Sequence, residues 1–210
     1  MRVRRAPKRA AYDRAAIDAI LDEAIVCHVA FVDGGQPYVI PTLHARVADV
    51  VYLHGSTASR MVRTLASGAP CSLTATLLDG IVLARSAFHH SANYRSVTVL
   101  GRATLVTSEQ ERLRALEAFT EQLVPGRWSQ VRAPDRKEMK GTQVLALALD
   151  EASAKVRTGP PVDDDEDMGR AVWAGEIPLA LRAGEPRADP QMAAGVALPA
   201  HVRAWTASRR

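Results

Sequence analysis

The sequence predicts a mostly β protein, in which about six to seven short antiparallel strands close into a barrel with helices at its periphery. Three observations predict this fold. Short apolar runs recur along the chain, tight turn signals separate several of them, and only a few segments have helical periodicity. Helices do not alternate regularly with the runs, which argues against a parallel βαβ sheet. With 210 residues and 47% hydrophobic residues, the chain has enough apolar material for a sizeable core.

The first quarter of the chain predicts a helix followed by a β meander. Asp13 is a suitable N-cap for a helix over residues 13–25, where Ile17, Ile20 and Leu21 share one face. An Asp-Gly-Gly turn signal at residues 33–35 separates the next two apolar runs. The predicted strands of the meander are residues 27–32, 37–45 and 50–53.

The middle of the chain predicts two further helices among strands. A short helix over 57–67 ends at Gly68 and Pro70, and Ser108 with Glu111 forms a capping-box pattern that opens a helix to about Leu123. A further helical turn is expected over 134–140. The predicted strands are residues 71–78 and 81–85, joined by an Asp79-Gly80 turn, followed by 95–107, 143–149 and 154–156.

A change of composition divides the chain near Gly159. Residues 1–157 are expected to form the barrel domain, and residues 158–210 an acidic, Pro/Gly/Ala-rich C-terminal extension. The extension is expected to dock through the short hydrophobic segment 171–179, with the remainder as loop. The acidic run 163–167 lacks the spacing and glycine of a calcium loop, and a solvated loop is the better interpretation.

Composition argues against several classes of protein. The net charge is only +4 and the aromatic content 5%, so an interleaved basic and aromatic face for nucleic acid is not expected. No run approaches the roughly 20 apolar residues of a membrane span, and the basic N-terminal stretch lacks the apolar h-region of a signal peptide. Cys27 and Cys71 lie far apart in apolar runs, which predicts a reduced, cytoplasmic protein. The excess of basic residues lies at the chain ends: Arg2, Arg4, Arg5, Lys8, Arg9, Arg203, Arg209 and Arg210.

The junction at residues 53–60 is the strongest candidate for a ligand site. A buried strand there passes through a Gly/Ser/Thr turn into a helix that opens with Ser59 and Arg60. Backbone N–H groups, hydroxyls and the guanidinium fork are groups that bind a phosphate monoester. The alternative is an ordinary capped helix start with a surface arginine. Taken alone, the residues leave both interpretations open.

The remaining polar residues suggest no metal site and identify no catalytic residue. His89 and His90 are adjacent and would face opposite sides of a strand, while His44 and His54 have no evident carboxylate partner for a metal. The cluster over residues 91–97 is different. Its Tyr94 and Arg95 side chains suit stacking and hydrogen bonding at a subunit or ligand interface.

Several motifs in fixed order resemble a known family. They are GQPYVIPTL at residues 35–43, YLHG at 52–55, SR at 59–60, NYRSV at 93–97 and GRA at 101–103. Together they resemble the FMN-binding split barrel of the pyridoxamine 5′-phosphate oxidase superfamily, in the branch with the nitroimidazole-resistance reductases and flavin-nucleotide-binding proteins. The resemblance covers about residues 10–157 and implies a homodimer with FMN at the subunit interface.

The resemblance also implies a set of cofactor-binding residues. Strand residues Pro41, Thr42 and Leu43 would run beside the isoalloxazine, and Ser59 with Arg60 would bind the FMN phosphate. The other residues that it implies near the flavin are His54, Gly55, Ser96 and, in a loose match to a C-terminal tryptophan of the family, Trp173. To these we add Tyr94 and Arg95 from the interface cluster.

The sequence also departs from the family pattern. Met61 stands where a lysine usually completes the phosphate site, so Arg60, Arg63 or Lys155 would have to compensate. The substrate-binding residues of the true oxidases are missing, which argues against pyridoxamine phosphate oxidation. The expected function is therefore an FMN-dependent oxidoreductase acting on a small molecule. Two alternatives remain: a split barrel that uses haem or a deazaflavin coenzyme, and a non-catalytic flavin-binding or regulatory module.

Overall fold

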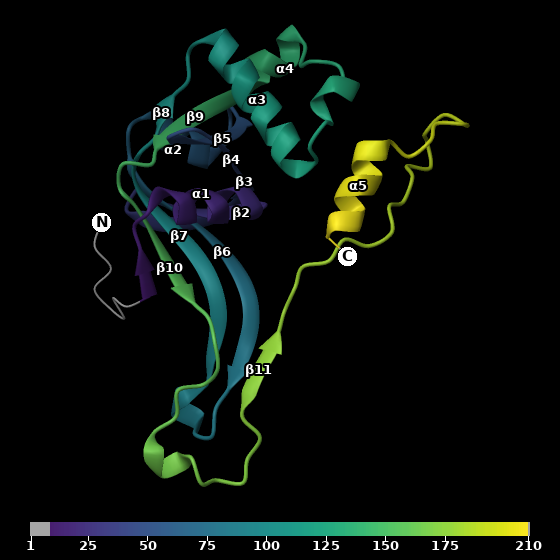
Figure 1. Cartoon of the computed structure of the whole chain (residues 1–210). Coiled ribbons are helices and arrows are strands. Elements are labelled where there is room, and N and C mark those ends of the chain that lie inside the picture. The colour runs from purple at the N-terminus through teal and green to yellow at the C-terminus, as the bar shows by residue number, and fades with distance from the viewer. Residues whose placement is uncertain (1–8, 210) are drawn as a thin grey trace.

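Two antiparallel sheets enclose the core of the protein (Figure 1). The computed structural model describes residues 9–209, so Arg2, Arg4, Arg5, Lys8 and Arg210 lie outside the described residues. The strands are β1 Ala10–Ala11, β2 Val26–Asp33, β3 Gln36–Leu43, β4 Ala45–Val47, β5 Val50–Ser56, β6 Pro70–Leu83, β7 Ser91–Arg102, β8 Thr104–Leu105, β9 Thr142–Ala148, β10 Ala152–Arg157 and β11 Gly175–Pro178. The helices are α1 Arg14–Glu23, α2 Arg60–Ala66, α3 Glu109–Leu123, α4 Arg136–Gly141 and α5 Ala200–Ser208, with short 3-10 turns η2 Ala87–His89, η3 Trp128–Gln130 and η4 Asp165–Asp167.

The larger sheet has the strand order β1-β10-β7-β6-β2-β3, with β11 added beside β6, and the smaller sheet has the order β4-β5-β9-β8. All pairings are antiparallel. The predicted mostly β, antiparallel class with peripheral helices is therefore confirmed. The described residues form more strands than predicted, because β1 and β11 were not expected as strands and some predicted runs are interrupted. The run 37–45, for example, breaks at His44 into β3 and β4.

Two predicted helix starts have the expected caps. The Asp13 carboxylate accepts a hydrogen bond from the Ala16 amide at 2.9 Å, and α1 buries Ile17, Ile20 and Leu21. Ser108 caps α3 by accepting from the Glu111 amide at 3.3 Å. In a full capping box the Glu111 side chain would also accept a hydrogen bond from the Ser108 amide. Here the Glu111 carboxylate instead accepts a hydrogen bond from the Tyr52 hydroxyl at 3.0 Å. This contact connects α3 to the outer surface of β5.

The prediction of a turn at Asp79-Gly80 was wrong. Strand β6 continues through both residues, and its pairing with β7 shifts register between Leu78 and Gly80. An extra residue inside a long hairpin forms a β-bulge and not a reversal, because the same partner strand pairs on both sides of it. A Cβ at Gly80 would lie 3.0 Å from the Ile177 carbonyl oxygen, so the glycine also allows β11 to approach.

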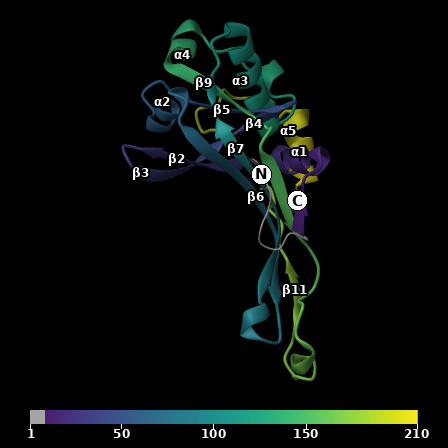
Figure 2. The same ribbon diagram turned by 90° about the vertical axis from the view of Figure 1, so that its left-hand side faces the viewer.

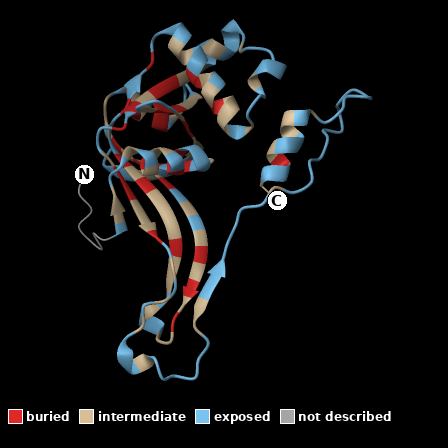
Figure 3. Cartoon of the chain, in the orientation of Figure 1, coloured by how far each residue is buried: buried red, intermediate tan, exposed pale blue. Residues whose placement is uncertain are grey.

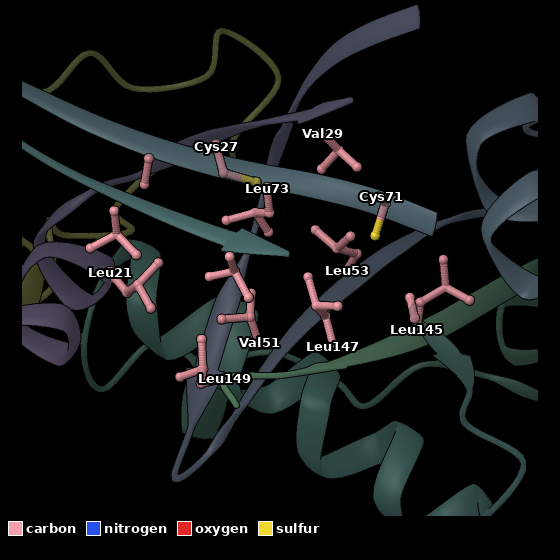
Figure 4. Packing of buried hydrophobic residues seen from close by; sticks show 14 of the residues in the cluster. Leu21, Cys27, Val29, Val51, Leu53, Cys71, Leu73, Leu145, Leu147 and Leu149 are labelled. Atoms are coloured by element: carbon pink, nitrogen blue, oxygen red, sulfur yellow. The ribbon is translucent and has the colours of Figure 1, made fainter. Parts of the chain in front are cut away.

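The main core lies between the two sheets and α1 (Figures 3 and 4). Its labelled members include Leu53, Leu73, Leu145 and Leu147, all of which are almost completely buried. Cys27 and Cys71 are free thiols in this core. Burial raises the pKa of the Cys27 thiol to about 12, so it is an inert apolar side chain at neutral pH.

The C-terminal extension runs back along the long β6–β7 hairpin (Figures 1 and 2). Strand β11 pairs with β6, and its Glu176 accepts a hydrogen bond from Asn93. The prediction that the rest of the extension is loop was wrong for residues 200–208, which form α5. The division of the chain into two domains at residue 157 stays a prediction. No helix within residues 9–209 is long and apolar enough to cross a membrane.

Candidate functional site

The backbone of the junction between β5 and α2 is already hydrogen-bonded within the protein. The Thr57 amide donates to the Gly141 carbonyl at 3.1 Å, and the Ser59 amide donates to the Ser56 carbonyl at 2.9 Å. The Ala58 amide donates to the Ser56 hydroxyl at 3.2 Å. These amides were expected to face an anion. In this structure the turn uses them for its own closure, which corresponds to the alternative interpretation as a helix start.

Gly55 lies where α2 packs closely against the end of β5. A Cβ at this position would lie 2.9 Å from a methyl group of Val62, a fully buried side chain of α2. The glycine lets the helix lie directly on the end of β5. Met61 faces the same way and is 6% exposed, within the main core. A lysine at position 61 would have to bury its ammonium there, which explains the departure from the family pattern.

Ser59 and Arg60, at the start of α2, have side chains that make no capping contact to the helix or are largely exposed. The Ser59 side chain makes no capping hydrogen bond to α2. The Arg60 guanidinium lies 4.5 Å from the centre of the Tyr38 ring, and its Nε is 3.6 Å from the Asp33 carboxylate. Arg60 and Asp33 line a shallow cleft of about 260 Å³ together with Arg63. An anion in this cleft would compete with Asp33 for the arginines.

The β3 residues lie at the edge of the larger sheet, where β3 pairs only with β2. Across the larger sheet, Pro41 of β3 pairs with His28 of β2. His28 pairs in turn with Thr74 of β6, Thr74 with Thr98 of β7, and Thr98 with Ser153 of β10. Residues two apart on one strand share a face, so Leu43 and Ser96 lie on the same face as this row. Thr42 belongs to the opposite face, beside Cys27.

Two of the predicted residues take part in local contacts elsewhere. The Arg95 guanidinium is held by the carboxylates of Asp79 at 2.8 Å and of Glu23 at 2.9 Å, which raises the pKa of the arginine. This cluster engages the charge that was expected to meet a ligand. Trp173 is 65% exposed in the extension, and its ring covers Gly175. Tyr94, two residues before Ser96, shares the face of Ser96.

His54 lies on the surface of β5 that faces α3, opposite the surface from which Leu53 enters the main core. Its ring packs edge-on against Phe119 with the ring centres 4.3 Å apart. The Nδ1 atom is buried without a hydrogen-bond partner, and no described residue bonds to the other ring nitrogen. Burial lowers the pKa of His54, so the imidazole is neutral at pH 7. Such a ring has a lone pair available for a proton or a metal ion.

A cavity of about 460 Å³ opens beside His54. Leu116 of α3 contributes to its wall, and the segment after α3 adds Trp128, Val131, Arg132 and Pro134. These wall residues carry no sequence pattern typical of a site, because they lie in η3 and the connection to α4, where no periodicity or motif marks them. The only local signal was a tryptophan within a polar, proline-bounded stretch.

Three comparisons place this fold among known proteins. A family model described as pyridoxamine 5′-phosphate oxidase matches residues 13–156. The flavocytochrome Anf3 from Azotobacter vinelandii is 40% identical, with a TM-score of 0.91 over 99% of this chain and 95% of that chain. The FAD- and haem-binding protein from Mycobacterium smegmatis is also 40% identical, with a TM-score of 0.89 over 93% of this chain and 96% of that chain.

A more distant match supports the fold alone. A protein of Bacteroides thetaiotaomicron, described in connection with 5-nitroimidazole antibiotic resistance, is 21% identical, with a TM-score of 0.59 over 70% of this chain and 86% of that chain. A search of curated proteins found no match. The family model covers well over half of the residues, and the expected split barrel agrees with these structures. The chain therefore belongs to the pyridoxamine 5′-phosphate oxidase family.

Proposed function

We propose that the protein is a flavin- and haem-binding redox protein of the flavocytochrome type. The observation that carries the proposal is the 40% identity to Anf3 and to the FAD- and haem-binding protein, which extends over nearly the whole chain. The matched region includes the C-terminal extension, which the family model does not cover. This favours the haem alternative of the sequence analysis over an FMN-only oxidoreductase, and FAD over FMN as the flavin.

The residues at the β3 edge fit a flavin. Strand β3 pairs with β2 alone in the larger sheet, so backbone groups on its far side are available to the heteroatoms of a ring system. Ser59 has a hydroxyl that caps no helix amide, and the Arg60 fork is 54% exposed in its cleft. In the proposal, Pro41–Leu43 hold the ring edge and Arg60 holds a phosphate.

A bound flavin would supply both one- and two-electron redox chemistry, so the protein itself needs no general acid or base. The chain's own task is to bind and orient the cofactors and to exclude water from them. This agrees with the sequence analysis, which identified no catalytic residue. The enzymatic role remains part of the proposal, with a flavin-binding module without turnover as the second candidate.

We also propose a homodimer that covers the outer face of the larger sheet. This face carries the exposed side chains of Val26, Val32 and Val39, which are 42%, 55% and 61% exposed. Together with Pro41 they form an apolar strip along β2 and β3. A second copy seated on this strip would bury it and would bring two β3 edges close together. Light scattering of the purified protein should give twice the 22.7 kDa chain mass.

Absorption spectroscopy of the purified protein tests the proposal directly. We expect flavin bands together with a Soret band, and release of FAD on denaturation when the extract is chromatographed beside FAD and FMN standards. Bleaching of the flavin bands by NAD(P)H, followed by recovery in air, would support an oxidoreductase. A protein that stays colourless after incubation with FAD, FMN and hemin would contradict cofactor binding. Flavin bands without haem after the same incubation would contradict the flavocytochrome.

A further inference from the structure

We propose that the tip of the projecting β6–β7 arm of one copy of the chain docks on residues 124–141 of a second copy. The arm is the long β6–β7 hairpin together with the part of the extension that runs beside it (Figures 1 and 2). Its tip consists of residues 85–90, which include η2, and residues 160–170, which include η4. The inference rests on the homodimer proposed above, adds a second contact region to it, and does not depend on either cofactor.

The tip is held in one conformation by buried polar contacts. The Asp163 side chain is 1% exposed, and its two oxygens accept hydrogen bonds at 2.9 Å from the backbone amide and the guanidinium of Arg85. The buried Arg157 side chain donates to Asn93 on β7. These contacts fasten the chain that leads into η4 to the β6–β7 hairpin. A surface that is ordered in this way loses little conformational entropy when it binds a partner.

The same tip exposes large apolar side chains. Phe88 of η2 is 89% exposed, Val162 is 76% exposed, and Met168, directly after η4, is 56% exposed. The two 3-10 turns adjoin, since the His89 ring nitrogen lies 3.1 Å from the Asp164 carboxylate. Figure 3 shows no second layer of the protein against this end of the arm. One exposed apolar residue is ordinary, whereas several on a single ordered projection are typical of an interaction surface.

The charge around these apolar residues indicates what binds there. Residues 163–170 carry five carboxylates and one cation. Asp167 pairs with Arg170, whereas Asp165 and Glu166 are exposed and form an ion pair with no described residue. A partner surface for the tip should therefore be cationic around an apolar centre.

Residues 124–141 form a surface of that kind at the other end of the molecule. Residues 127–140 carry five cations and two carboxylates. One of the cations, Arg132, is paired with Glu138 at 2.6 Å. The other four are exposed and form an ion pair with no described residue: Arg127, Arg136, Lys137 and Lys140.

The cavity of about 460 Å³ beside this segment supplies the apolar centre. Its lining is mixed, with Trp128, Val131 and Pro134 next to polar groups such as Thr120 and Thr142. Protein interfaces are on average only about as apolar as the rest of a protein surface, and their binding energy is concentrated in a few anchoring side chains. The cavity therefore suits the Phe88 side chain of a docked tip.

The arrangement of the two surfaces makes a second copy the partner. The tip and residues 124–141 lie at opposite ends of the molecule in both views, so they cannot meet within one chain (Figures 1 and 2). Two copies related by a two-fold axis form the contact twice, once at each end, and the assembly then closes as a dimer. Attraction between the acidic tip and the basic segment would also orient the two copies as they approach.

Sedimentation equilibrium of the full-length protein tests this contact through the dissociation constant of the dimer. Joint replacement by Asp165→Lys and Glu166→Lys should raise this constant by about tenfold or more, because exposed pairs are individually weak but four of them reverse in a two-fold dimer. Phe88→Ser should raise it by about tenfold through loss of an aromatic anchor. Asp150→Lys, at an exposed carboxylate in the β9–β10 turn, is the matched control and should leave the constant unchanged.

Charge exchange and cross-linking separate a lost contact from misfolding. Joint replacement by Arg136→Glu and Lys137→Glu should also weaken the dimer, and combining it with the two lysine substitutions should restore the dimer, which misfolded variants would not do. Because Cys27 and Cys71 are buried, a mixture of Phe88→Cys and Val131→Cys chains should form a disulfide between copies under mild oxidation. Neither variant alone should form it to the same extent.

The outcomes distinguish this inference from the homodimer itself. A dissociation constant that stays unchanged in the Asp165 and Glu166 variant, or a mixture that forms no cross-link, would overturn the docking of the tip and leave the dimer over the β2 and β3 strip intact. Species larger than a dimer that grow with protein concentration would overturn the closed two-fold arrangement. A monomeric wild type would overturn both this inference and the proposed homodimer.

Discussion

Strand β5 ends between two regions, the junction with α2 and the surface that faces α3. The polar groups of these two regions differ in whether they have hydrogen-bond partners. On the α2 side, the amides of Thr57, Ala58 and Ser59 already donate to protein oxygens. On the α3 side, one residue earlier than Gly55, His54 has a buried nitrogen with no partner beside a cavity. The first side has the conspicuous sequence motif, and the second side has the unsatisfied chemistry.

This difference shows what a motif alone can indicate. A Gly/Ser/Thr turn before a helix satisfies its own backbone as readily as it binds a phosphate, so the pattern fits both outcomes. An unpaired buried nitrogen has a free-energy cost, and the cost is offset only if a ligand or a water molecule completes it. On the α2 side, the proposed flavin contact therefore depends on side chains, above all on Arg60.

The largest expected effect comes from Arg60→Ala. Loss of a hydrogen bond between charged groups should weaken flavin binding by about 1.5–3 kcal/mol, measured by fluorescence titration of the apoprotein with FAD. Arg127→Ala, which removes an exposed cation of the segment after α3, is the control. If Arg63→Ala carries the loss and Arg60→Ala does not, the phosphate lies deeper in the cleft. If neither changes the affinity, the α2 side holds no phosphate.

Gly55→Ala should destabilise the fold by about 1–3 kcal/mol, because the new Cβ would lie 2.9 Å from the stiff, fully buried Val62. Urea unfolding of the apoprotein measures this free energy. Gly141→Ala is the matched control, since nothing lies within 4 Å of its Cβ position and α4 ends there. Equal stabilities of the two variants would mean that α2 can move away from β5, and that the junction is less rigid than described.

Acid should destabilise the fold through its two buried histidines, His44 and His54. Burial lowers the folded-state pKa of His54 and of His44 below the ordinary value of 6.5, so below that pH the unfolded chain binds more protons. Stability is therefore full above pH 6.5 and is lost as the pH falls from 6.5 through the lowered folded values. Unfolding free energies of wild type and His54→Gln between about pH 7 and 5 should diverge in slope. Parallel slopes would show that His54 does not titrate with folding.

The smallest effect concerns the core thiols, which belong to neither side. Cys27 is fully buried with its pKa raised to about 12, so it should resist a thiol reagent such as iodoacetamide in the native protein at pH 8. Mass spectrometry should find it modified only after unfolding. Rapid labelling of Cys27 in the native state would mean that the core between the sheets opens readily, which would also weaken the argument from buried groups at His54.

Much of the fold was predictable because it follows from local patterns. Asp13 and Ser108 cap helices where the sequence places them, and the Asp-Gly-Gly turn after residue 32 connects two paired strands. The failures are also physical. Asp79-Gly80 has the chemistry of a turn, yet the pairing of β6 with β7 continues past it as a bulge. Helix α5 was missed because its exposed, alanine-rich segment shows little periodicity.

The candidate site was only half predictable. Pro41–Leu43, Ser59 and Arg60 were named as flavin-binding residues from motif order, which stays a prediction, and Met61 could be recognised as a departure. The reason for Met61, which is the burial of its side chain in the main core, required the structure. The walls of the His54 cavity come from residues far apart in the chain, and nothing in the local sequence of Trp128 or Arg132 relates them to a strand residue at position 54.

By itself the sequence determined the antiparallel β class, the helix caps and the order of motifs that places the chain in its family. These properties depend on neighbouring residues, where side-chain alternation and capping act over a few positions. The tertiary structure alone decided which amides of the junction are already used and which histidine nitrogens are buried without a partner, those of His44, His54 and His201 among the described residues. Hydrogen-bond satisfaction and burial depend on partners that the fold brings together, such as Gly141 with Thr57 and Phe119 with His54.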